Sequence, residues 1–208
     1  MKNQLPKITT QQIAQTLQLA FIYILFSLPL ITVGAATCAA YYVSLKIINK
    51  TPDINIFSLF LKSFKLNLVQ GTLMWILTTI MLYFVSLIWQ NLAQNDYDSF
   101  LKLVFAVVIS IIAGAFILYS FPSIARYTNK LPILIRNSAV LCLQFYTYTI
   151  PLVLKLFVIY FIPAFLVTFI PPLFFAAILL LPISTIMLIS SVTNKMFCEL
   201  ETPQPTED

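Results

Sequence analysis

Long apolar runs alternate with short polar segments along almost the whole chain. Crossing the roughly 30 Å hydrocarbon core of a bilayer takes about 20 apolar residues in a helix that rises 1.5 Å per residue. Five windows reach that length: residues 13–32, 72–90, 101–122, 150–170 and 173–192. Two prolines between the last two windows predict a tight antiparallel hairpin there. The pattern predicts an all-α, polytopic membrane helix bundle with about five transmembrane helices.

Two further segments are too polar to cross a membrane and too apolar to be free loops. In residues 56–69, Lys62 and Lys65 share one helical face, and a row of phenylalanines follows the opposite face. This periodicity is typical of an amphipathic helix that lies in the headgroup plane. Residues 131–144 carry a shorter polar cluster, and we interpret them as a second interfacial elbow. The chain then divides into a polar N-terminal segment, one transmembrane domain and an acidic tail, which are residues 1–12, 13–193 and 194–208.

A short internal repeat is the second organising feature. FSLP at residues 26–29 is similar to YSFP at residues 119–122, and each is followed by Ala, Tyr and a base, an elbow, and a glutamine. A real repeat would relate the first two transmembrane helices to the next two in the same orientation, with the fifth unpaired. Because the likeness is short and gapped, coincidence is the alternative.

The distribution of charge predicts the orientation of these helices. Basic residues follow the first and third windows, whereas the NDYD segment between the second and third is acidic; the bases are Lys46, Lys50, Lys62, Lys65, Arg126, Lys130 and Arg136. The positive-inside rule places the basic segments in the cytoplasm of a multi-pass plasma-membrane protein. This scheme leaves Lys2 and Lys7 outside the cell. In the alternative, the chain turns at Gly34 and residues 35–48 cross back wholly or partly; we prefer five helices, because fourteen residues are short for a crossing.

The composition excludes a soluble fold. The chain is 60% hydrophobic and 9% charged, whereas soluble domains are about 25% charged. Its mean hydropathy is +0.94. The net charge of +5 does not indicate nucleic-acid binding, because the bases flank apolar spans, where anionic lipid attracts them.

Catalytic and metal chemistry lacks the residues it needs. The chain has no histidine, and its seven acids all lie outside the five windows: Asp53, Asp96, Asp98, Glu199, Glu201, Glu207 and Asp208. Hydrolysis and proton transfer need a placed base or nucleophile, and coupled transport commonly needs an intramembrane carboxylate. The three cysteines are widely spaced, which predicts free thiols. We therefore expect no enzyme, no cofactor and no metal site.

Three groups of residues remain as candidates for contacts. Partner or lipid contacts are expected at Lys62, Lys65, Asn67, Arg126, Arg136, Asn137 and Lys155. Lys155 lies within the fourth window, where it serves an anion or partner site or extends to the cytoplasmic headgroups. Helix packing, within or between subunits, is expected at Ala106, Ser110 and Gly114, which share one ridge. A turn is expected at Pro29, Thr32 and Gly34, as a kink or as the lining of a cavity.

The residues from Leu25 to Gln70 carry a family resemblance. FSLPLITVGAATCAAYYVSLKI followed by FSLFLKSFKLNLVQ resembles the signature half of the YesL-like family of small bacterial integral membrane proteins. The shared pattern is a proline, a threonine-glycine turn, paired tyrosines, and a phenylalanine-rich basic elbow with Asn and Gln. FPSIARY and LIRNS resemble the second block of that family.

The resemblance implies a genomic context rather than a mechanism, because the family has no known function and its genes commonly lie beside carbohydrate-uptake genes. Our leading hypothesis is an accessory membrane protein of oligosaccharide import that associates with the permease or ATPase subunits of an ABC-type importer. The alternatives are a small channel or facilitator for a neutral solute, alone or as a homo-oligomer, and a membrane regulator or assembly factor.

Overall fold

A computed structural model describes residues 10–52, 55–94, 100–127, 131–169 and 172–201. These residues form a chain of helices, and no strand occurs among them. The helices are α1 (Thr10–Ser27), the short 3-10 turn η1 (Leu30–Thr32), α2 (Val33–Ile48), α3 (Ile56–Gln94), α4 (Phe100–Arg126), α5 (Leu131–Gln144), α6 (Tyr146–Phe169) and α7 (Leu173–Glu201). Within this part of the chain, five helices are long and apolar enough to cross a membrane. The all-α, multi-pass membrane architecture is thus confirmed.

The first predicted span is wrong in its bounds. Residues 13–32 do not form one helix, because α1 ends at Ser27 and the chain turns before α2. Pro29 withholds a backbone donor at this point, and the hydroxyl of Thr32 donates to the carbonyl oxygens of Phe26 and Pro29, each at 2.8 Å. The predicted turn is therefore where the helix breaks, and the first span by length and hydropathy is residues 30–48.

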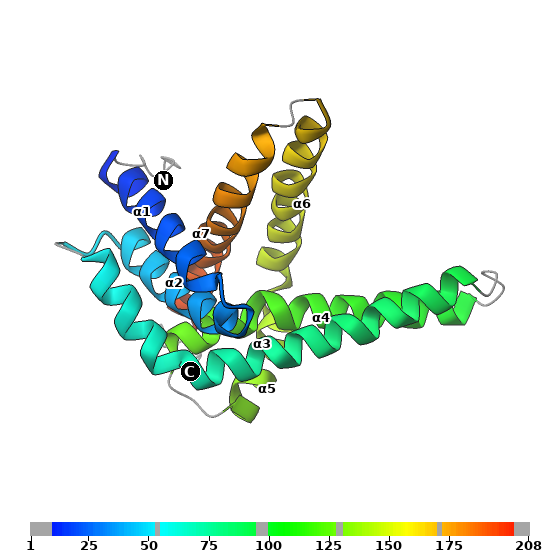
Figure 1. Ribbon diagram of the computed structural model, residues 1–208. Coiled ribbons are helices and arrows are strands. Elements are labelled where there is room, and N and C mark those ends of the chain that lie inside the picture. Colours follow the sequence, from blue (N-terminus) through cyan, green and yellow to red (C-terminus); the bar gives the residue numbers. More distant parts are fainter. Residues whose placement is uncertain (1–9, 53–54, 95–99, 128–130, 170–171, 202–208) are drawn as a thin grey trace, which may run out of the picture.

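The alternative crossing, residues 35–48, lies inside α2, the central helix of the fold. α2 packs against α1, α3, α4 and α7, and Figure 1 shows it between α1 and the rest of the molecule. Gln12 Nε2 donates to the carbonyl oxygen of Ile47 at 3.2 Å, so the start of α1 lies beside the end of α2. This antiparallel arrangement places the start of α1 near Lys46, in the last turn of α2. Lys2 and Lys7 lie outside the described residues.

The predicted elbow at residues 56–69 is not a separate interfacial helix. It is continuous with the second span in the 39-residue α3, whose direction changes along its length in Figure 1. We call residues 56–70 the first arm of α3 and residues 71–94 the second arm. The phenylalanines of the first arm meet protein: Phe60 and Phe64 lie 5.3 and 5.1 Å from the ring of Phe26. Their apolar face thus packs on α1 and α2 instead of lipid.

The other predicted elements match more closely. The second elbow has the bounds of α5, and a break at Phe145 separates it from α6. The tail predicted to begin at residue 194 starts as helix, because α7 continues to Glu201 and buries Phe197; residues 202–208 lie outside the described part. The internal repeat is not reproduced in detail, because FSLP ends a helix whereas YSFP lies inside α4.

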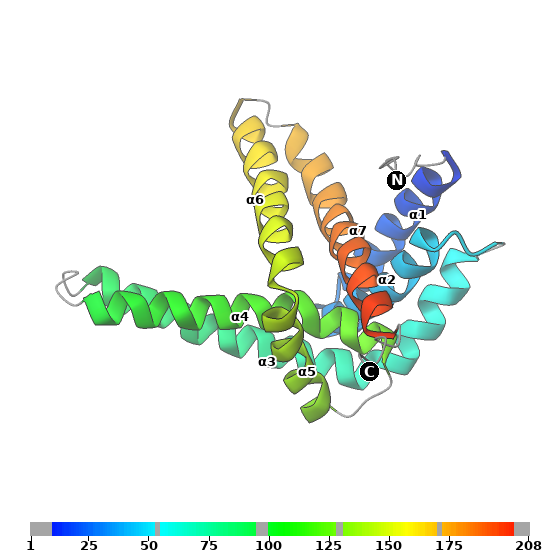
Figure 2. The same ribbon diagram turned by 180° about the vertical axis from the view of Figure 1, so that it is seen from behind.

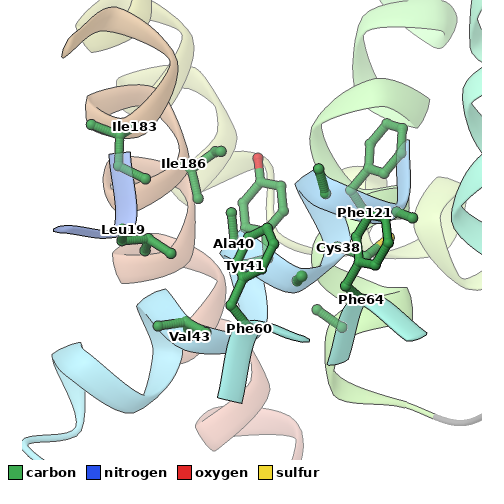
Figure 3. Close-up of a cluster of buried hydrophobic side chains, with 14 of the residues drawn as sticks. Leu19, Cys38, Ala40, Tyr41, Val43, Phe60, Phe64, Phe121, Ile183 and Ile186 are labelled. Atoms are coloured by element: carbon green, nitrogen blue, oxygen red, sulfur yellow. The ribbon is translucent and has the colours of Figure 1, made fainter. Parts of the chain in front are cut away.

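The buried core lies where α1, α2, the first arm of α3, the end of α4 and α7 meet. Figure 3 shows Leu19, Tyr41, Phe60, Phe121 and Ile186 converging there from these five helices. From this base two hairpins project in different directions, as both views show (Figures 1 and 2). The first hairpin pairs the second arm of α3 with α4, and the second hairpin pairs α6 with α7.

Two glycines make a close contact between α2 and α3. A Cβ atom built on Gly34 would lie 2.0 Å from the carbonyl oxygen of Gly71, and one built on Gly71 would lie 2.8 Å from Cα of Ala35. Both obstacles are backbone, which cannot rotate away, so α2 and α3 can approach this closely only without side chains. Gly114, by contrast, has no atom within 4 Å of its Cβ position.

Substituting these glycines tests the contact. We expect Gly34→Ala and Gly71→Ala each to destabilise the protein by about 1–3 kcal/mol or more, the usual cost of overpacking. Gly114→Ala should be neutral or stabilising, because alanine favours a helix by up to about 1 kcal/mol where space is free. Thermal unfolding of the purified protein in detergent measures all three. Equal behaviour of the three variants would contradict the close approach.

Candidate functional site: a basic cleft at the base of the hairpins

A cleft of about 560 Å³ opens between α2, the first arm of α3 and the end of α4. Its lining combines two cations with hydroxyl and amide groups; it consists of Tyr42, Lys62, Ser63, Leu66, Asn67, Val69, Gln70, Ile124, Ala125 and Arg126. We call it the basic cleft. Three of the expected contact residues, Lys62, Asn67 and Arg126, therefore line one site, although Lys62 and Asn67 lie near the start of α3 and Arg126 lies at the end of α4.

Arg126 is held in place from the side of α7. Its Nη1 donates to Oδ1 of Asn194 at 3.2 Å, and its guanidinium lies 5.1 Å from the ring centre of Phe197. Asn194 in turn donates to Oδ1 of Asn49 at 2.9 Å. Stacking on an aromatic face and a fixed hydrogen bond both restrict a guanidinium. The cation at this wall of the cleft is thus pre-positioned.

The opposite wall belongs to the first arm of α3. Asn67 Nδ2 donates to the carbonyl oxygen and to Oγ of Ser63, at 3.0 and 3.2 Å. Lys62 is exposed at the cleft, whereas Lys65, one turn further along the same helix, is exposed outside it. Tyr42 lines the cleft from α2, and Nζ of Lys46 lies 5.8 Å from the centre of the Tyr42 ring. Among the described residues that line this cleft, the charged ones are the cations Lys62 and Arg126.

The remaining contact candidates lie elsewhere. Arg136 is exposed on α5, and Asn137 lines a separate cavity of about 230 Å³ between α4, α5 and α7. Lys155 is exposed on α6 and does not line the basic cleft. Of the packing candidates, Ala106 is buried, and Ser110 accepts a hydrogen bond from Trp89 Nε1 at 3.0 Å. The structure thus places Arg136, Asn137 and Lys155 outside the basic cleft, although the sequence grouped them with Lys62 and Arg126 as contact residues.

The polar groups within the two hairpins tie helices together. Trp89 and Ser110 join α3 to α4, and Thr185 and the hydroxyl of Tyr160 join α7 to α6 at 3.0 Å. Hydroxyls in apolar helices commonly bond either across a helix pair or to their own backbone. Thr79, Ser110, Ser184 and Thr185 each donate to a carbonyl oxygen three or four residues earlier. The hydroxyls of these four residues are thus satisfied by the backbone of their own helices.

The cysteines are three free thiols, as expected. Cys38 is buried, Cys142 is half-buried and Cys198 is exposed. Burial raises the pKa of the Cys142 thiol, which disfavours the reactive thiolate. Among the described residues, no group of His, Cys, Asp and Glu side chains could hold a metal ion.

Part of the chain matches the model of a protein family. No curated protein and no solved structure matches the chain. The matched segment starts in α1 and extends into the second arm of α3, so it includes the glycine contact and the α3 wall of the basic cleft. The match is consistent with the YesL-like resemblance, and the matched family is described as one of unknown function. Residues 15–88 match the family described as "Protein of unknown function, DUF624".

Proposed function

We propose that the protein is an accessory subunit of an ABC-type carbohydrate importer and docks on the permease through its second hairpin. The observation that carries the proposal is a row of four phenylalanines on α6. Phe157, Phe161, Phe165 and Phe169 recur every four residues and are 56–69% exposed. We call them the phenylalanine ridge. Side chains at i and i+4 form the ridges by which helices pack.

The surroundings of the ridge favour a partner helix. Among the described residues, α6 packs mainly against α7, with smaller contacts to the end of α5 and, through Thr149, to Tyr119 of α4. A shallow apolar groove of about 490 Å³ runs beside Phe157 and Phe161. The rings of Phe157 and Phe161 stack with their centres 5.4 Å apart, and those of Phe165 and Phe169 are tilted by 57° with their centres 5.0 Å apart. A row of exposed aromatic rings suits a groove of small residues on another transmembrane helix. The resemblance supplies the class of partner.

A role without chemistry of its own agrees with the residues present. The chain has no histidine, and the described carboxylates, Glu199 and Glu201, both belong to the last turns of α7. The Glu199 carboxylate accepts a hydrogen bond from the hydroxyl of Tyr148. We therefore propose that the protein is an adaptor in the plasma membrane. The end of the molecule that carries the basic cleft would face the cytoplasm.

Co-purification tests the partnership. Full-length tagged protein, extracted from its native membrane in mild detergent, should recover permease or ATPase subunits of an ABC-type importer, identified by mass spectrometry. Recovery of the protein alone with lipid would overturn the proposal. Solute flux through liposomes containing only this protein would favour the channel. A deletion that changes permease abundance and leaves turnover per permease unchanged would favour the assembly factor.

Matched phenylalanine substitutions locate the contact. We expect Phe161→Ala with Phe165→Ala to reduce permease recovery about tenfold or more, because buried aromatic anchors commonly contribute 2 kcal/mol or more. The control is Phe84→Ala with Phe105→Ala on the first hairpin, where both side chains are 59% exposed, close to the 58% and 56% of the tested pair. Loss of recovery in the control alone would move the interface to the first hairpin.

Native and introduced thiols test the orientation. Cys198 is exposed near the end of α7, so a membrane-impermeant maleimide should label it only after the cells are permeabilised. Phe100→Cys, at a position that is 80% exposed at the start of α4, should react in intact cells. The buried Cys38 serves as the unreactive internal control. The reverse labelling pattern would invert the proposed topology.

A further inference from the structure

We propose that the basic cleft binds the phosphate-bearing headgroup of an anionic phospholipid. The geometry supplies two cations from different helices, Lys62 on α3 and Arg126 on α4, which line the same cleft. Guanidinium and ammonium groups are the side chains that most often bind phosphate oxygens in proteins. This inference stands apart from the proposed docking on a permease.

The depth of the cleft fits a headgroup. Lys102 and Arg126 bracket the uncharged residues 103–125 of α4, a stretch of 23 residues that spans about 35 Å at the helical rise of 1.5 Å per residue. That length exceeds the roughly 30 Å hydrocarbon core by only a few ångströms. When α4 crosses the bilayer, Arg126 therefore lies at the level of the lipid phosphates.

The edges of the cleft fit a lipid rather than a free ion. Its lining includes Leu66 and Val69, which are 73% and 67% exposed. These apolar side chains continue the apolar surface of α3 from the cations toward the second arm, which is the path an acyl chain would follow. The volume of about 560 Å³ is that of a small-ligand pocket and leaves room for the glycerol beside the phosphate.

Binding of labelled phosphatidylglycerol to the detergent-solubilised full-length protein tests the site. Phosphatidylglycerol should bind about tenfold or more tightly than zwitterionic phosphatidylcholine, because Lys62 and Arg126 repel the trimethylammonium group that lies beside the phosphate of phosphatidylcholine. Lys62→Gln should weaken binding of phosphatidylglycerol about tenfold. Lys65→Gln, which removes the same charge outside the cleft, should change it less than about twofold.

Arg126 requires a second variant, because it contacts Asn194 and Phe197. Arg126→Gln should abolish most of the preference for phosphatidylglycerol, and Arg126→Lys should restore part of it, since the charge returns without the planar fork. If Arg126→Gln fails to fold, Lys62→Gln carries the test, because Lys62 makes no hydrogen bond or ion pair with any described residue. Circular dichroism in detergent reports folding for each variant.

Three outcomes would overturn the assignment. Equal losses in Lys62→Gln and Lys65→Gln would mean general surface attraction. Equal affinity for the two lipids would mean that the headgroup charge is not recognised. Displacement of the labelled lipid by glycerol 3-phosphate at comparable concentration would identify a soluble phosphate compound as the ligand. Failure of permease co-purification would leave all three readouts unaffected.

Discussion

The close approach of α2 to α3 at Gly34 and Gly71 is the constraint on which the rest of the base depends. Two turns beyond Gly34, α2 presents Tyr42, and in the turns before Gly71, α3 presents Asn67 and Lys62; these three residues line the basic cleft. The separation of the helices at the glycines therefore sets the width of the cleft. The same approach buries Phe60 and Phe64, because the first arm of α3 lies flush along α2.

The helical, membrane-spanning character of the chain could be predicted because it rests on the length of apolar runs. The bounds of α5 were predictable for a similar reason, since polar residues delimit it. The central position of α2 could not be predicted from hydropathy. Its glycine and alanines score weakly as apolar residues, yet they are what allows four other helices to pack against it. The small residues of VGAATCAA do indicate a closely packed helix. The prediction instead followed the length of the segment, which is short for a membrane crossing.

The basic cleft was only partly predictable. Charge and amphipathicity singled out Lys62, Asn67 and Arg126, but sequence spacing grouped Arg126 with Arg136 rather than with α3. The contribution of α7 to positioning Arg126 depends on contacts about 70 residues apart in sequence, between Arg126 and both Asn194 and Phe197. The first elbow was misassigned because an amphipathic helix presents the same periodicity whether its apolar face meets lipid or another helix.

The continuity of α3 and α7 has a mechanical consequence. α3 runs unbroken from the wall of the cleft to the far end of the first hairpin, and α7 runs from the far end of the second hairpin to Asn194 and Phe197 beside Arg126. Large changes of backbone direction are usually absorbed by a few residues in loops or at the ends of elements. α7 is one continuous helix from the second hairpin to Asn194 and Phe197, which hold Arg126. Any swing of the second hairpin would therefore displace the groups that position this cation at the cleft.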